Sequence, residues 1–132
     1  MAVAVERIVK VPLFDGLSAD ELAAVAAKLE ERDVHVGEHL SSEGGAGYFF
    51  FVIESGAAEV VKHGERVAEL GPGDFFGEGA IFRARRRTAT VTATEAGTAF
   101  AMFGADFAKL VGDIPELHDR IEAALDARLP TD

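Results

Sequence analysis

The chain has 132 residues, of which 48% are hydrophobic and 27% are charged. This length and composition fit one globular domain with its own core, and they exclude a disordered chain or a multi-domain enzyme. The chain contains no cysteine, which excludes disulfides, thiolate catalysis and cysteine-ligated metals. Acidic residues outnumber Lys and Arg by 23 to 13, and the net charge is −10. Such a surface repels phosphate backbones, so we expect no direct nucleic-acid binding.

No run of about 18 apolar residues is present, so we expect no membrane insertion. The first residues lack a basic start followed by a long apolar stretch, so no signal peptide is apparent. These two observations predict a cytoplasmic protein. The chain also lacks internal repeats and low-complexity linkers, which favours a single domain over residues 1–132.

The first predicted element is a helix over about residues 18–31. Ser18 can cap its N-terminus, and Glu21 completes the Ser-x-x-Glu capping box. One face of this helix is apolar, through residues at helical spacing: Leu22, Val25, Ala26 and Leu29.

Short runs rich in Val, Phe, Thr and Ile follow from about residue 33 to 103, separated by glycine-bearing turns. They predict strands over residues 33–36, 39–42, 47–54, 57–63, 65–70, 88–94 and 97–103. Many short strands with a turn every few residues indicate an antiparallel sandwich, barrel or jelly roll.

The helical pattern returns after Gly104. We predict one helix over about residues 104–111, a break at Gly112 and Pro115, and a second helix over about 115–129. Leucine and isoleucine recur every four residues along this last helix. The predicted fold is therefore mainly β: an antiparallel, jelly-roll-like β-roll with an N-terminal helix and C-terminal helices.

Residues 71–91 interrupt the strand rhythm and combine three features that suit an anion. A short helical turn predicted at about 78–82 offers free backbone N–H groups, and Gly77 and Gly79 allow close approach to the backbone. Arg87, ten residues after Gly77, can return as a bidentate partner of the same anion. Glu78 would repel a bare phosphate, but it suits a hydrogen-bonding hydroxyl such as a sugar 2′-OH. A phosphate and a ribose hydroxyl together make up half of a nucleotide.

Arg87 ends a cluster of four arginines that includes Arg83, Arg85 and Arg86. One small cationic island on an acidic protein favours a small anionic ligand over a polyanion.

The order Phe76-Gly77-Glu78-x-Ala80, a gap, and then Arg87-Thr88-Ala89-Thr90 resembles the phosphate-binding cassette of cyclic nucleotide-binding domains, here residues 77–90. The upstream segment 71–76 and the segment 13–18 before the first helix also fit this family. The resemblance extends over roughly residues 10–129.

The resemblance implies a role for individual residues. Backbone N–H groups near Gly77, Gly79 and Ala80 would hold the cyclic phosphate, and Glu78 would bind the ribose 2′-OH. Arg87 would contact the phosphate, and Thr88 would contact the phosphate or the base. Ala58 and Val60 would contact the purine. Arg128 on the last helix would contact the base. In this family the last helix closes over the base as a lid.

The sequence therefore predicts a non-enzymatic sensor of a cyclic purine mononucleotide, with cAMP favoured over cGMP, that acts on an effector protein or fused domain. Two departures from the family pattern, Gly79 in place of a bulky aliphatic residue and Arg86 in place of proline, keep an alternative open. In that alternative the chain is an interaction or oligomerisation module with a degenerate pocket. A cupin-like enzyme is disfavoured, because no His-x-His with a following Glu and no acid/base pair is visible. We expect no metal and no cofactor.

Overall fold

A computed structural model describes residues 3–42, 44, 49–78 and 89–128. Its helices are α1 (Val5–Ile8), the 3-10 helix η1 (Pro12–Phe14), α2 (Ala19–Lys28), α4 (Gly104–Asp113) and α5 (Pro115–Arg128). Its strands are β1 (Glu30–Val34), β2 (His39–Ser41), β3 (Phe49–Ile53), β4 (Ala57–Lys62), β5 (Glu65–Leu70), β6 (Phe75–Phe76), β7 (Thr90–Glu95) and β8 (Gly97–Phe103).

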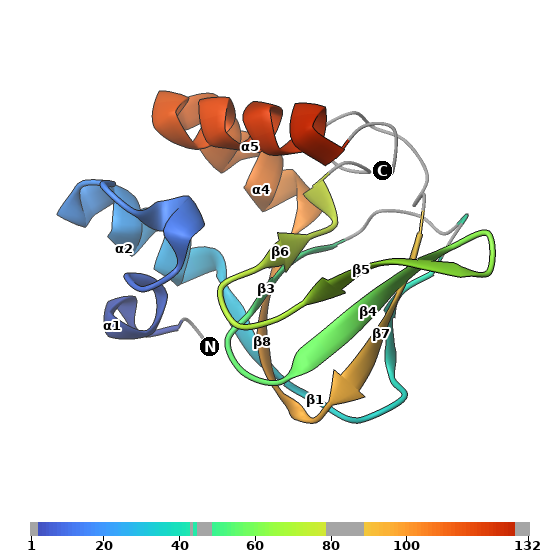
Figure 1. Cartoon of the computed structure of the whole chain (residues 1–132). Coiled ribbons are helices and arrows are strands. Elements are labelled where there is room, and N and C mark those ends of the chain that lie inside the picture. The colour runs from blue at the N-terminus through green and yellow to red at the C-terminus, as the bar shows by residue number, and fades with distance from the viewer. Residues whose placement is uncertain (1–2, 43, 45–48, 79–88, 129–132) are drawn as a thin grey trace.

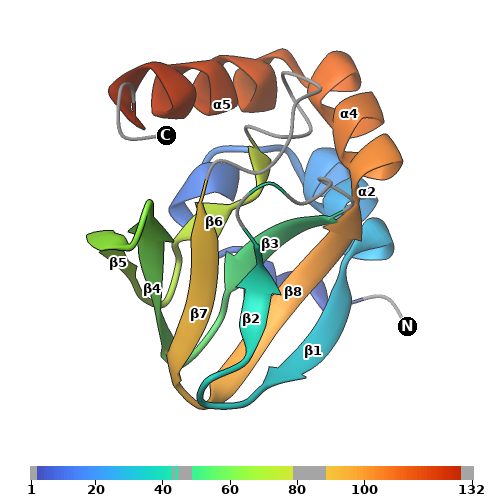
Figure 2. The same ribbon diagram turned by 90° about the vertical axis from the view of Figure 1, so that its right-hand side faces the viewer.

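The strands form two four-stranded antiparallel sheets, in the orders β1-β8-β3-β6 and β2-β7-β4-β5. The helices gather at one side of this β-roll, and α5 runs along the top of the molecule in both views (Figures 1 and 2). The predicted fold class, a mainly β roll with flanking helices, is confirmed.

The N-terminus of α2 is held as the sequence predicts. The Glu21 backbone N–H donates to Ser18 Oγ at 3.1 Å, and the Ser18 N–H donates to Glu21 Oε1 at 2.9 Å. The predicted end of this helix at residue 31 is wrong, because the backbone is already extended at Leu29. Glu30 and Glu31 suit a helix, but β1 gains a full ladder of hydrogen bonds with β8, and this pairing overrides local propensity.

Several other predicted boundaries shift for similar reasons. The predicted strand 33–36 is wrong, since β1 begins at Glu30 and a turn with Gly37 at φ +86° follows it. Gly112 does not break the helix as predicted but lies inside α4. The strands predicted at 65–70 and 97–103 coincide with β5 and β8. The short elements α1, η1 and β6 were not predicted, because each is shorter than the window over which periodicity can be read.

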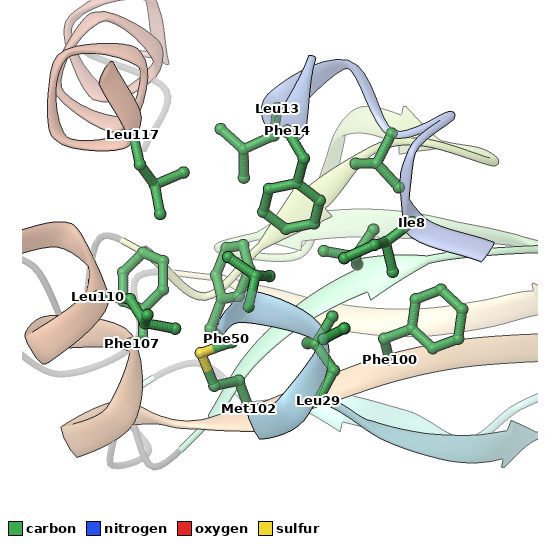
Figure 3. Close-up of a cluster of buried hydrophobic side chains, with 14 of the residues drawn as sticks. Ile8, Leu13, Phe14, Leu29, Phe50, Phe100, Met102, Phe107, Leu110 and Leu117 are labelled. Carbon is green, nitrogen blue, oxygen red and sulfur yellow. The ribbon is translucent and has the colours of Figure 1, made fainter. Parts of the chain in front are cut away.

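The largest apolar cluster lies between the first sheet and the helices (Figure 3). Successive residues of a strand point to opposite faces of its sheet. Phe50 therefore points to the helices, where its ring stacks on Phe107 with centroids 4.3 Å apart. Phe51 points into the roll and stacks on Phe76 with centroids 4.9 Å apart. The phenylalanine run thus serves the packing of both layers.

Arg7 ties the N-terminal helix α1 to the roll. Its Nε donates to Glu54 at 2.8 Å, it also pairs with Glu31, and its guanidinium lies 5.0 Å from the centre of the Phe100 ring. The hydrogen bond to Glu54, and to a smaller extent the one to Glu31, raise the pKa of Arg7 above its ordinary value. The Arg7 guanidinium therefore stays charged in this contact.

Within the described part of the chain, no helix combines the length and the apolar character needed to cross a bilayer.

Candidate functional site

The candidate site begins at the end of β6, which a tight turn fixes against β3. In this turn the Gly71 N–H donates to Asp74 Oδ2 at 2.8 Å. The Gly73 N–H donates to the Ile53 carbonyl, and the Ile53 N–H donates to the Asp74 carbonyl, each at 2.8 Å. These bonds determine where the chain emerges after Phe76.

Gly77 and Glu78 follow directly. Gly77 has φ +93°, a left-handed conformation that a side chain would disfavour, so the glycine is required by the backbone itself. Glu78 is 2% exposed and is the one buried charged or polar residue among those the structure describes. Carboxylates are rarely buried, because leaving water destabilises the charged form unless it gains hydrogen bonds or an opposite charge.

The roll interior beside this acid is apolar. Phe76 belongs to a cluster inside the roll whose other buried members are Phe51, Ile53, Ala58, Val91 and Ala101. Val60 is partly buried and packs against the same cluster. The period of two along β4 therefore places Ala58 and Val60 on the inner face, as predicted, with Ala58 buried and Val60 only half-buried.

Four of the predicted site residues are described: Ala58 and Val60 pack in the same roll cluster as Phe76, and Gly77 and Glu78 directly follow Phe76. The other calls lie outside the described residues: Gly79, Ala80, Arg87 and Thr88, together with the remaining arginines of the cluster and most of the predicted turn 78–82. Arg128 is the last residue of α5, and its side chain also lies outside the described part.

Chemically, this arrangement suits a ligand with one apolar face and one hydroxyl. Alanine and valine offer a flat apolar surface, and a buried carboxylate accepts hydrogen bonds strongly from a hydroxyl donor. No group of three His, Asp or Glu side chains that could hold a metal ion occurs within the described ranges.

A comparison with protein families identifies residues 31–113 as a cyclic nucleotide-binding domain. The chain belongs to this family. The matched range contains the described site residues and the segment from Gly79 to Thr88, and it ends just before α5.

Individual relatives agree with this assignment. The chain is 35% identical over 101 residues to a cAMP-dependent protein kinase regulatory subunit of Yarrowia lipolytica, covering 76% of this chain and 27% of that protein. This chain covers between 18% and 27% of the length of that relative and of two further fungal cAMP-dependent protein kinase regulatory subunits.

Solved structures share the fold. The Thermus thermophilus catabolite activator protein superposes with a TM-score of 0.79 at 28% identity, covering 89% of this chain and 58% of that chain. The regulatory subunit of a cAMP-independent protein kinase A from Trypanosoma brucei superposes with a TM-score of 0.86 at 21% identity, covering 96% and 45%. The second likeness concerns the fold alone.

Sequence reasoning gave no weight to Arg120, which the structure places in a contact between α5 and η1. Nothing in a single sequence marks such a residue, because its acceptor is a backbone carbonyl 107 positions away.

Proposed function

We propose that the chain binds a 3′,5′-cyclic purine mononucleotide inside the β-roll, with cAMP favoured over cGMP, and acts in the cytoplasm as a ligand-sensing regulatory module. The observation that carries this proposal is the burial of Glu78 next to the left-handed Gly77, within the range that matches the family. A glutamate that was only part of a surface turn would be exposed to solvent.

In this proposal each part of the ligand has its own partner. Glu78 accepts a hydrogen bond from the ribose 2′-OH, and the inner face of β4 at Val60 contacts the purine. Arg87 pairs with the cyclic phosphate. Arg87 lies three residues before Thr90, which pairs with Val61 of β4 in the second sheet. The backbone N–H groups near Gly77, Gly79 and Ala80 and the hydroxyl of Thr88 complete the phosphate site.

The proposed output is a change in the position of α5. A ligand shifts a conformational equilibrium only through its different affinity for the two states. Contact between the base and the C-terminal part of α5, near Arg128, would supply that difference. An effector protein or fused domain would then respond to where α5 lies.

Calorimetric titration of the purified chain with cAMP, cGMP and 5′-AMP tests the proposal. We expect both cyclic nucleotides to bind, cAMP more tightly, and 5′-AMP to bind much more weakly. Arg87→Ala should weaken cAMP binding by about 3 kcal/mol, roughly a hundredfold in Kd, because the phosphate loses a charge-assisted bidentate partner. Arg66→Ala is the matched control, since Arg66 is an exposed β5 residue whose partners are Glu59 and Glu69.

Unchanged affinity in Arg87→Ala would contradict the assignment of the phosphate site. No binding of any nucleotide at millimolar concentration would favour the alternative, a docking or oligomerisation module with a degenerate pocket.

A further inference from the structure

Arg120 makes a long-range contact between α5 and the N-terminal part of the chain. Its Nη1 donates to the backbone carbonyl of Leu13 in η1 at 2.9 Å. Its Nη2 lies 3.7 Å from Glu116 Oε2, one turn earlier on the same helix. The hydrogen bond to the carbonyl fixes the direction of the guanidinium, and the exposed ion pair adds little to it.

Gly16 lies next to this guanidinium. A Cβ atom built on Gly16 would lie 3.4 Å from Arg120 Nη2, and Gly16 has φ +81°. The positive φ at Gly16, which favours glycine, turns the chain back after η1 directly beside Arg120.

Apolar contacts flank the polar one. Leu117 and Ile121, on either side of Arg120 along α5, are buried in the same cluster as Leu13 and Phe14 of η1 (Figure 3). Apolar burial is strong but not directional, so it holds α5 against η1 without fixing how far the helix slides or rotates. A charge-assisted hydrogen bond is directional and supplies that missing constraint.

We infer that Arg120 is a positioning residue, which holds α5 in its docked register on η1 and thereby sets how readily the nucleotide site accepts its ligand. Its effect on binding rests on the proposed function, whereas its effect on the position of α5 does not. In the docked register α5 runs above the end of β6, the strand that leads into Gly77 and Glu78 (Figures 1 and 2). In this inference the docked register is the position of α5 that the ligand favours, so loss of the contact would populate other positions of α5 and lower the binding-competent fraction.

A distance measurement tests the first part without any nucleotide. Because the chain has no native cysteine, Asp20→Cys on α2 and Ala123→Cys on α5 give two unique, exposed sites for spin labels. We expect Arg120→Met, which keeps most of the side-chain stem, to shift or clearly broaden the distance distribution of the ligand-free protein. Arg120→Lys, which keeps the charge and a donor, should restore part of the narrow distribution. An unchanged distribution in Arg120→Met would overturn the inference.

Glu116→Gln is the matched control, because it removes the ion pair and leaves the bond to Leu13. The pair involves an exposed glutamate and should contribute little, so the distribution should stay narrow. If Glu116→Gln moved α5 as much as Arg120→Met, the carbonyl contact would not be what positions the helix, and the inference would fail.

Titration with cAMP tests the second part. We expect Arg120→Met to weaken binding about tenfold, with Glu116→Gln within twofold of the unmodified chain. Unchanged affinity in Arg120→Met, together with a moved helix, would overturn the link between α5 register and the site. Failure of the unmodified chain to bind cAMP would instead count against the proposed function, and the label distances would still decide the role of Arg120.

Discussion

The two faces of β3 lead into two apolar regions of different size and purpose. The helix-side cluster joins 19 buried residues from α1, η1, α2, α4, α5, the segments next to these helices and the outer face of the first sheet. The cluster inside the roll joins six, and one of them, Phe76, directly precedes Gly77 and the buried Glu78. The larger region carries most of the apolar burial, so it should dominate stability. The smaller one should tolerate a buried charge and an apolar ligand face because less of the fold depends on it.

Phe50→Ala should produce the largest loss of stability and so test this division most strongly. Phe50 is fully buried and contacts both Phe107 and Phe75. Removing its ring from the helix-side cluster should lower the free energy of unfolding by about 4 kcal/mol. Urea denaturation provides the measurement. Phe49→Ala is the control, since Phe49 is only half-buried and its loss should have less than half the effect.

Gly97→Ala should rank second and act on the roll alone. A Cβ at this position would lie 2.2 Å from the Ser55 carbonyl oxygen, where the β3–β4 turn crosses the start of β8. The backbone must shift to relieve this contact, and we expect a loss of about 3 kcal/mol.

Gly71→Ala provides the comparison for that experiment. Gly71 has no heavy atom within 4 Å of the added Cβ and does not have a positive φ. Thermal unfolding should therefore give a melting temperature close to that of the unmodified chain. Equal losses for the two alanine variants would show that chain flexibility, rather than the close approach to Ser55, determines the effect.

Ser18→Ala should have a smaller effect, confined to the helical side. It removes the side-chain acceptor of the α2 capping box, and the expected loss is about 1 kcal/mol. Ser42→Ala, at an exposed position outside any helix or strand, should change the free energy of unfolding by less than about 0.5 kcal/mol. A Ser18→Ala variant as stable as Ser42→Ala would mean that tertiary packing alone holds the start of α2.

The comparison also explains what the sequence could and could not predict. The runs between glycine-bearing turns predicted β5 and β8 correctly, and the capping box placed the start of α2. The end of α2 was missed because Glu30 and Glu31 pair with β8 across more than 60 positions, which no local pattern reveals.

The same limit applies to the site. The sequence analysis explained Gly77 by close approach of a ligand to the backbone, and φ +93° shows a second reason for glycine, the left-handed backbone conformation itself. From residue type alone, Glu78 is expected at the surface. Its burial depends on the turn at 71–74, which fixes β6 to β3, and this tertiary contact cannot be predicted from residue type. Arg120 could not be found at all from residue type or spacing, since a backbone carbonyl leaves no mark in the sequence.

A thermodynamic cycle tests the central claim, that the buried carboxylate of Glu78 receives the ribose hydroxyl, most directly. The unmodified chain and Glu78→Gln are each titrated with cAMP and with 2′-deoxy-cAMP, after circular dichroism shows that the variant is folded. We expect each single change to weaken binding about tenfold and the two together to weaken it little more than either alone, since 2′-deoxy-cAMP lacks the donor hydroxyl and Glu78→Gln removes the charge that strengthens the same hydrogen bond. Losses that simply add, or cAMP affinity that Glu78→Gln leaves unchanged, would contradict the account.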